Sequence, residues 1–223
     1  MDSIANDQFE DGGSIPASSL HFCGGMIGEA ENLVKKYHYS KRTPGSVVFV
    51  GSFHMPGGLF GDQGEMVAAA FFSSPPTRWS EPVIELTRLV RKDGIRVPLT
   101  RLISLSLQHL KRQGYDLIVS FADRTQGHEG YVYRAASWKY HGCRERACDG
   151  ILIDGVFTPG RTCNALYGTR SPDKLKLILT HKKIEPHFDE GKHLYWKELN
   201  KRGLKKASRL MIEAKPYPNN RQS

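Results

Sequence analysis

The stretch LTRLVRKDGIRVPLTRLIS, residues 86–104, joins an expected β-strand to an expected α-helix through a short basic loop. The strand EPVIELTRLVR, residues 81–91, alternates so that Glu85 falls on one face and Arg88 on the other. Pro98 suits the first position of the following helix, and Gly114 suits its end. A strand that runs through a loop into a helix predicts a fold with both α and β elements.

The loop of this unit is predicted to bind phosphate. Arg91, Lys92 and Arg96 surround Gly94, which allows a ligand to approach the backbone closely. The free N–H groups and the positive dipole end of the helix converge at the same place. Neither the P-loop nor the dinucleotide-binding fingerprint is present, so the loop alone does not identify the ligand.

The flanking sequence extends this unit into one mixed sheet. Periodicity predicts a helix, two strands, a third strand, a helix, a strand, a helix and a strand, with no internal repeat. We therefore expect an α+β (mixed α/β) fold with a central twisted sheet flanked by helices. The segments are 28–39 (helix), 46–55, 65–74 and 81–91 (strands), 98–114 (helix), 115–123 (strand), 127–138 (helix) and 138–146 (strand).

Length and composition suit a soluble single-domain protein. The chain has 223 residues, 39% of them apolar, and no apolar run long enough to span a bilayer. The N-terminus lacks the pattern of a signal peptide, which favours a cytosolic protein. The chain has four cysteines: Cys23, Cys143, Cys148 and Cys163. They are expected to be free thiols, because their spacing, even with His141 included, is not that of a standard zinc site.

Positive charge is concentrated in the last part of the chain. Residues 161–223 carry 15 Lys and Arg against 6 Asp and Glu, whereas residues 1–160 carry 17 of each sign. We expect a loose acidic arm over 1–18, a catalytic domain over 19–160 and a basic extension over 161–223. The extension is expected to pack on or continue the domain and to contact DNA through Lys205 and Lys206. A merely solvated basic helix is the alternative.

The segment VKKYHYSKR, residues 34–42, is the first candidate for chemistry. His38, with an ordinary pKa near neutrality, could deprotonate or orient an amine, and Tyr39 could donate a proton to a developing charge. A histidine that only ends a helix is the alternative. Ser40 and four cations surround the pair and would contact a polyanion: Lys35, Lys36, Lys41 and Arg42.

Two further groups follow. Ser120, Asp123, His128 and Tyr133 gather around the end of a buried strand, where ligands of α/β proteins usually bind, although Asp123 could equally cap a helix. Trp138 and Tyr140 alternate onto one strand face. That face could stack an extruded base, although such pairs more often belong to the core.

Together these segments resemble the GNAT N-acyltransferase fold. The features shared are the strand, the basic βα loop, the helix, the next strand and the tyrosine-bearing helix. The resemblance implies that the loop at 91–96 binds the pyrophosphate of coenzyme A, and that two neighbouring strands part to admit the pantetheine arm. Arg91-Lys92-Asp93-Gly94 matches only the first half of the usual R/Q-x-x-G-x-G/A loop.

More narrowly, the chain resembles the Mom family of phage DNA-modification proteins. YHYSKR, ELTRLVRKDG, the run YDLIVSFAD to GHEGYVYRAASWKYHG, ALYGTRSPDKLK and EAKPYPNN carry this resemblance. It implies transfer of a carbamoylmethyl group to N6 of adenine in double-stranded phage DNA, in the host cytoplasm, as protection from restriction. The resemblance makes His38 and Tyr39 active-site residues and adds four others: Arg91, Ser104, Asp123 and Tyr133.

The resemblance also bears on cofactors. It implies acetyl-CoA or a related acyl donor. It also implies an iron requirement, for which the sequence offers no clear ligand set. Two other functions remain open: an acyl-CoA-dependent acetyltransferase of a protein or small-molecule amine, and a non-catalytic DNA-binding protein. The basic C-terminal part favours DNA over an acidic metabolite as the partner.

Overall fold

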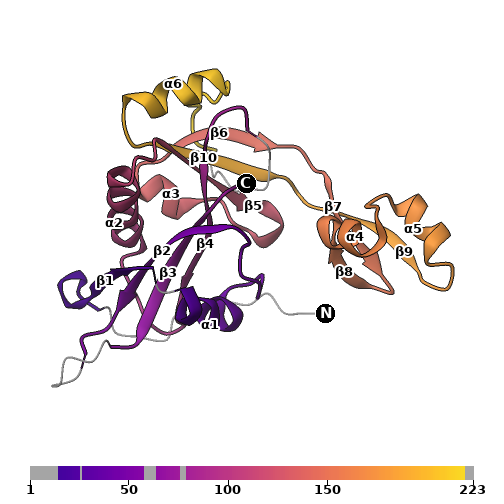
Figure 1. Ribbon diagram of the computed structural model, residues 1–223, viewed down its shortest axis with the longest axis horizontal. Coiled ribbons are helices and arrows are strands. Elements are labelled where there is room, and N and C mark those ends of the chain that lie inside the picture. Colours follow the sequence, from indigo (N-terminus) through magenta and orange to yellow (C-terminus); the bar gives the residue numbers. More distant parts are fainter. Residues whose placement is uncertain (1–14, 26, 58–63, 76–78, 219–223) are drawn as a thin grey trace, which may run out of the picture.

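A computed structural model describes residues 15–25, 27–57, 64–75 and 79–218. Its main sheet has seven strands in the order β1-β2-β3-β4-β5-β10-β6 (Figure 1). Every neighbouring pair is antiparallel except β4 and β5, which are parallel. The strands are β1 His21–Gly24, β2 Val47–His54, β3 Met66–Ser73, β4 Ile84–Arg91, β5 Leu117–Asp123, β6 Lys139–Arg144 and β10 Lys192–Glu198.

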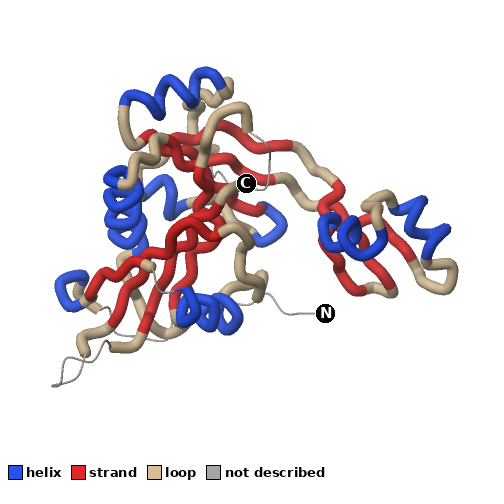
Figure 2. The backbone as a smooth tube through the Cα atoms, in the orientation of Figure 1, coloured by secondary structure: helices blue, strands red, loops and turns tan. Residues whose placement is uncertain are grey.

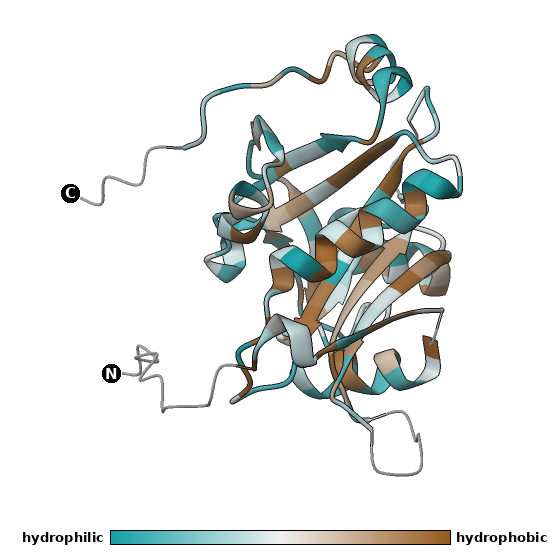
Figure 3. Ribbon diagram, turned by 90° about the vertical axis from the view of Figure 1, so that its left-hand side faces the viewer, coloured by the Kyte–Doolittle hydropathy of each residue, from teal (hydrophilic) through white to brown (hydrophobic). Residues whose placement is uncertain are grey.

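Helices cover both faces of this sheet. On one face lie α1, Ile27–Tyr37, which packs over β3 and β4, and α6, Lys201–Arg209, which packs over β5 and β10. On the other face lie α2, Leu99–Arg112, and α3, Tyr131–Ala135. The strands behind these helices are mostly apolar (Figure 3). Every residue of β3, MVAAAFFS, is buried, and its three alanines leave room for helices on both sides.

A second, smaller unit projects from the ends of β6 and β10 (Figures 1 and 2). We call residues 148–188 the lobe. It has a three-stranded sheet in the order β8-β7-β9, covered by two short helices around its own small core. Its elements are β7 Cys148–Ile153, β8 Val156–Pro159, α4 Gly160–Tyr167, α5 Pro172–Ile178 and β9 Ile184–Phe188.

The two strands that lead to the lobe are tied together by Asp189. This side chain is completely buried and pairs with the guanidinium of Arg144. Its carboxylate also accepts hydrogen bonds from the backbone N–H groups of Ala147 and Gly191, at 3.2 and 3.1 Å. These contacts hold the pKa of Asp189 below its ordinary value, because hydrogen bonds to the ionised form outweigh its burial. The connection is therefore cross-linked at its base.

The expected order of elements over residues 28–146 is confirmed, and the mixed sheet with flanking helices is confirmed as the fold class. Three features differ from expectation. Pro98 precedes α2 as its N-cap and is not inside the helix. The short edge strand β1 was not expected. Residues 1–14 of the expected acidic arm lie outside the described residues. Ile15, however, donates its N–H to Arg96 O at 3.3 Å and packs its side chain on the core, so the end of the expected arm is attached to the domain.

The expected boundary after residue 160 does not separate two structural units. Strand β10, residues 192–198, lies between β5 and β6 and pairs with both along its length. The lobe, in turn, takes strands from both sides of residue 160. The basic C-terminal part is therefore an integral piece of the domain. Within the described residues, no helix combines the length and apolarity needed to cross a membrane.

Candidate active site

The parallel strands β4 and β5 part soon after they meet. They pair only at Ile84 with Ile118 and at Glu85 with Val119. Beyond that point a cavity of about 300 Å³ opens between them, which we call the central cavity. It is lined by side chains of the α1–β2 loop, β4, β5 and the segment before and within α3: His38, Tyr39, Thr87, Arg88, Leu89, Leu99, Phe121, Ala122 and residues 127–133. The expected parting of two strands is thus present.

His38 follows the last residue of α1 and is almost fully buried. The backbone N–H of Ser40 donates to its Nδ1 at 3.1 Å, and Ser40 Oγ lies 2.9 Å from the same atom. A backbone N–H can only donate, so Nδ1 must be the unprotonated nitrogen. The neutral ring of His38 therefore carries its proton on Nε2.

The charge state of His38 follows from its surroundings. Burial lowers the pKa of His38 to about 4, and the positive charge of Arg88 is the next largest cause. The expected pKa near neutrality is wrong, because the sequence did not reveal this burial. At neutral pH the imidazole is uncharged, with Nδ1 occupied by Ser40, so His38 is suited to donate a hydrogen bond through Nε2–H and not to accept a proton.

Tyr39 stands beside His38 at the edge of the central cavity. Its ring lies 4.4 Å from the ring of His38 and 5.2 Å, edge-on, from that of His128. Partial burial raises the pKa of the Tyr39 hydroxyl, so this group is protonated at neutral pH and can donate. The structure thus brings together His38 and Tyr39, as expected, and adds His128 from the loop before α3.

Tyr133 lines the central cavity from α3 and is buried. Its hydroxyl lies 2.7 Å from Ser120 Oγ, which also donates to Leu86 O at 2.7 Å. A serine hydroxyl has one proton and a carbonyl only accepts, so Tyr133 is the donor to Ser120. Burial raises the pKa of Tyr133 to about 12. Tyr133 is therefore a protonated group whose hydrogen is directed at Ser120.

Asp123, also expected to be catalytic, lies outside the lining of the central cavity. Its carboxylate accepts from Thr125 N at 3.1 Å, as the N-cap of a 3-10 turn at Arg124–Gln126, and lies 3.3 Å from Lys192 Nζ. The capping alternative thus describes its contacts. Asp123 acts on the cavity only at a distance, through the negative charge that it presents to Tyr39.

A β-bulge in β4 changes which side chains share a face. Glu85 lies opposite Ser73 and Arg88 lies opposite Phe71, because Thr87 is passed over in the pairing with β3. Ser73 and Phe71 are two residues apart, so Glu85 and Arg88 point to the same side of the sheet, the side of α1. The strict alternation that would place them on opposite faces is therefore wrong.

Glu85 is a functional candidate that the sequence did not single out. It is buried, and its Oε2 has no hydrogen-bond partner among the described residues. Burial raises the pKa of Glu85 to about 7, against the opposing charges of Arg88, Lys192 and Arg161. A carboxylate flanked by the apolar residues Ile84 and Leu86 at the start of a strand is the signal that could have identified it.

Glu85→Gln is expected to remove a pH-dependent loss of stability. In the unfolded chain the carboxyl ionises near 4.5, and in the folded chain near 7. Stability therefore falls as pH rises between these values and is constant above them. Urea unfolding at pH 5 and pH 8 should show the advantage of the glutamine variant growing by about 2–3 kcal/mol. Equal pH dependence in both proteins would contradict the buried carboxyl.

The expected phosphate loop is partly supported by its geometry. Gly94 has a φ of +73°, a conformation that favours glycine, and Arg91 is exposed. No side chain caps the start of α2, although the backbone N–H groups of Leu99 and Arg101 already donate to Val97 O and Pro98 O, each at 2.9 Å. Lys92, however, pairs with Glu65 at 2.7 Å, and this contact raises the pKa of Lys92. Its ammonium is thus already engaged away from the helix start.

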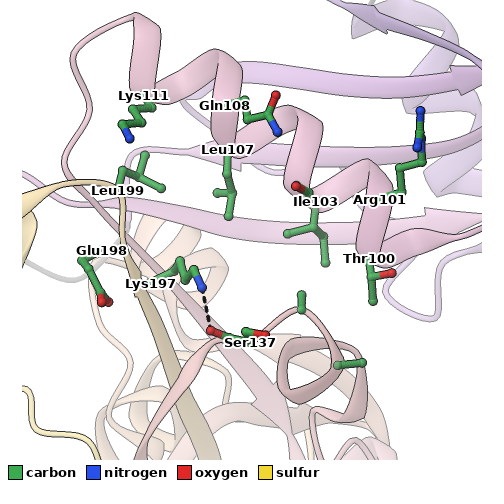
Figure 4. A pocket seen from close by; sticks show the side chains of 13 residues that line it. Thr100, Arg101, Ile103, Leu107, Gln108, Lys111, Ser137, Lys197, Glu198 and Leu199 are labelled. Carbon is green, nitrogen blue, oxygen red and sulfur yellow. Dashed lines mark hydrogen bonds between the residues drawn. The ribbon is translucent and has the colours of Figure 1, made fainter.

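Ser104 lines a second cavity of about 580 Å³, which we call the α2 groove (Figure 4). Its floor is apolar, with Ile103, Leu107 and Leu199, and cations stand around it; Lys197 Nζ donates to Ser137 O at 2.7 Å. The two cavities share α2 and α3 as walls: Leu99 and residues 131–133 line the central cavity, and residues 100–111 and 135–137 contribute to the α2 groove. The full lining is Thr100, Arg101, Ile103, Ser104, Leu107, Gln108, Lys111, Ala135, Ala136, Ser137, Lys197, Glu198 and Leu199.

Trp138 and Tyr140 do not offer a face to a base, which corrects the stacking hypothesis. Trp138 is 0% exposed and packs 5.3 Å from Tyr133. Tyr140 is stacked on Tyr217 and bonds through its hydroxyl to His193 Nδ1 at 2.9 Å. Both rings are enclosed by other aromatic side chains, so they belong to the core, as pairs of this kind more often do.

The basic residues expected to contact DNA fall into two classes. Lys35, Lys36, Lys41 and Arg42 are exposed beside the central cavity, and Lys205 is exposed on α6. Lys206 is different: its ammonium pairs with the buried Asp116 at 2.8 Å. Arg202 and Arg209 of the same helix pair with Asp116 and Glu81. Three of the five cations of this helix therefore attach it to acids beside the sheet.

The described residues do not fit the iron site that the resemblance raised. Among them, no three His, Cys, Asp or Glu side chains are placed to bind one ion. The cysteines are all free thiols. In the central cavity, Nδ1 of His38 is already bonded to Ser40. No step below is therefore derived through a metal.

Comparison with known proteins gave one family match. The sequence model of the Mom protein family matches residues 27–219. No curated protein matched the chain. Solved structures that resemble it include a putative GNAT-family acetyltransferase from Desulfovibrio desulfuricans, at 10% identity and a TM-score of 0.44, covering 81% of this chain and 99% of that chain. Another is a GNAT-family N-acetyltransferase from Escherichia coli in complex with CoA, at 13% identity and a TM-score of 0.49, covering 85% and 87%.

Proposed function

The chain belongs to the Mom protein family, and from this premise we propose that it transfers a carbamoylmethyl group to N6 of adenine in double-stranded DNA. One observation carries the proposal beyond the family. In the central cavity between β4 and β5, the uncharged or cationic hydrogen-bond donors His38, Tyr39 and Arg88 stand beside an exposed basic loop, and Glu129 is the acid in the lining. Such a wall suits a negatively charged acceptor and a reaction in which negative charge develops.

The acceptor enters, in this proposal, from the side of α1. The exposed cations at residues 35, 36, 41 and 42 would bind the DNA backbone, and the target base would be extruded into the central cavity. The lining has the volume for a base, at about 300 Å³. Since Trp138 and Tyr140 are enclosed, stacking would fall to the half-exposed ring of Tyr39 and to Tyr131.

The chemistry requires removal of a proton from N6. The lone pair of N6 is delocalised into the adenine ring, so the amine is a weak nucleophile. A bond forms between N6 and the transferred carbon, the bond from that carbon to the leaving group breaks, and one N6 proton must go to a base. Glu85, with a pKa of about 7, is the group proposed to accept it; it lies outside the residues that line the cavity, on the face of β4 that it shares with Arg88. His38 Nε2–H and Tyr39 would donate to the developing negative charge.

The donor is proposed to be an acyl-CoA or a related molecule bound on the side of α2. If bound there, it would supply the activated carbon. An acyl-CoA itself would give an N6-acyl group and a free thiol, so transfer of a carbamoylmethyl group requires a related donor that carries the amide and a leaving group on its methylene carbon. Arg91, the turn at Gly94 and the uncapped start of α2 would bind its phosphates, and the parted strands would take its extended arm. The α2 groove, with Arg101 and Lys111 at its edge, offers further room for a nucleotide.

An acetyltransferase of another amine is the second candidate, favoured by the same parted strands and helix start. Mass spectrometry of nucleosides from DNA of cells that express the chain separates the two. We expect a shifted adenosine species that is absent when His38→Ala is expressed instead. Unmodified DNA from cells that contain soluble, folded protein would contradict DNA modification and favour another acceptor.

A further inference from the structure

Arg88 carries a charge that no acid of the described chain neutralises. Its Nη1 donates to Thr87 O at 2.6 Å and its Nε donates to Arg42 O at 3.3 Å. Both partners are neutral backbone carbonyls. None of the ion pairs found among the described residues includes Arg88. The guanidinium is therefore held in place from one side and retains donors for a ligand.

Three acids lie near the central cavity or share the face of Arg88, and none of them forms an ion pair with it. Asp123 lies 3.3 Å from Lys192, and Glu129 lies 3.3 Å from His193. Glu85 shares the face of Arg88, but burial raises its pKa to about 7, so this carboxyl is only partly ionised at neutral pH. The guanidinium of Arg88 is thus not paired with any of these acids. The carboxylate that a bound anion would meet in the lining is that of Glu129, beside a His193 whose pKa is lowered by burial.

Donors converge on the same wall. His38 has its Nε2–H free of Ser40, and Tyr39 and His128 stand beside it. The charge of Lys41 also reaches His38. A guanidinium in a partly buried wall, surrounded by neutral donors, is the chemistry that binds an oxyanion such as a phosphate.

The side of the sheet indicates which molecule brings this anion. Arg88 lies opposite Phe71, which packs in the core under α1, and it bonds to the loop that follows α1. The site proposed for the phosphates of the donor lies at the start of α2, which packs on the opposite face. We propose that Arg88 binds a backbone phosphate of the acceptor DNA strand at the mouth of the central cavity. This inference rests on the proposed function, because it takes DNA as the acceptor.

The test is the salt dependence of DNA binding. The probe is a fluorescently labelled duplex, and affinity is measured by anisotropy over a series of KCl concentrations. Arg88→Gln keeps an amide that can donate to the carbonyls of Thr87 or Arg42 but removes the charge. We expect its slope of log K against log[KCl] to be smaller by about 1 than that of the wild type, equally for unrelated sequences. Arg112→Gln, at the exposed end of α2, is the matched control and should keep the wild-type slope.

The outcomes separate the two proposals. A wild-type protein that shows no salt-dependent DNA binding overturns DNA as the acceptor and the phosphate site with it. Wild-type binding with an unchanged slope in Arg88→Gln overturns the Arg88 site and leaves DNA as the acceptor. If Arg88→Gln melts at a lower temperature, Arg88→Lys decides, since it keeps the charge. A wild-type slope in this lysine variant supports the site, and a slope reduced as in the glutamine variant contradicts it.

Discussion

His38→Ala is expected to lower kcat/KM for DNA modification by about a hundredfold or more, with little change in melting temperature. The reason is the loss of the Nε2–H donor, and single donors to developing negative charge contribute factors of this size. Stability should change little because His38 contacts mainly the loop at Ser40 and the ring of Tyr39. Steady-state kinetics on a defined duplex and thermal unfolding measure the two effects.

A second variant separates the donor from a base. In His38→Gln the side-chain amide nitrogen lies near the position of Nε2 and can donate, but it cannot take up a proton at neutral pH. Activity within about tenfold of the wild type is expected if donation is the role, given the weaker geometry of an amide. Glutamine as inactive as alanine would return His38 to the role of a base and contradict the tautomer assigned from Ser40.

Trp138→Ala is expected to lower the free energy of unfolding by about 3–5 kcal/mol. Trp138 is fully buried, and its Nε1 has no hydrogen-bond partner in the described chain, so its contribution is packing. Trp138→Phe, which keeps an aromatic ring in the same space, should lose much less. Urea unfolding at constant pH measures both. A stable Trp138→Ala protein that has lost only DNA modification would restore the base-stacking hypothesis.

The elements up to residue 146 could be predicted from the sequence because each has a clear period and clear ends. The helix at Ile27–Tyr37 shows buried Ala30, Leu33 and Val34 at helical spacing, and the central strands are short apolar runs bounded by glycine and proline. Strand β10, KHLYWKE, has only three consecutive apolar or aromatic residues, with charged or imidazole side chains at both ends of each face. Its place between β5 and β6 is a long-range pairing, which local pattern does not encode.

The candidate site was predictable in location and less so in chemistry. The pairing of His38 with Tyr39, and their approach to Tyr133, agree with the sequence-based hypothesis. The tautomer of His38 and its low pKa depend on burial and on one backbone N–H, that of Ser40. The shared face of Glu85 and Arg88 depends on a bulge, since one extra residue reverses the side on which every later side chain lies.

The position of β10 has a consequence for how the chain assembles during synthesis. Strand β5, which borders the central cavity, has its second edge exposed until residues 192–198 have been made. The ribosome therefore releases most of the chain before the sheet can close, and the lobe, whose strands all precede β10 in the sequence, can form first. Removing the basic C-terminal part would accordingly leave an unfinished sheet with open edges on β5 and β6, which are prone to pair with other chains. The truncated chain would therefore not be a folded domain that lacks only a tail.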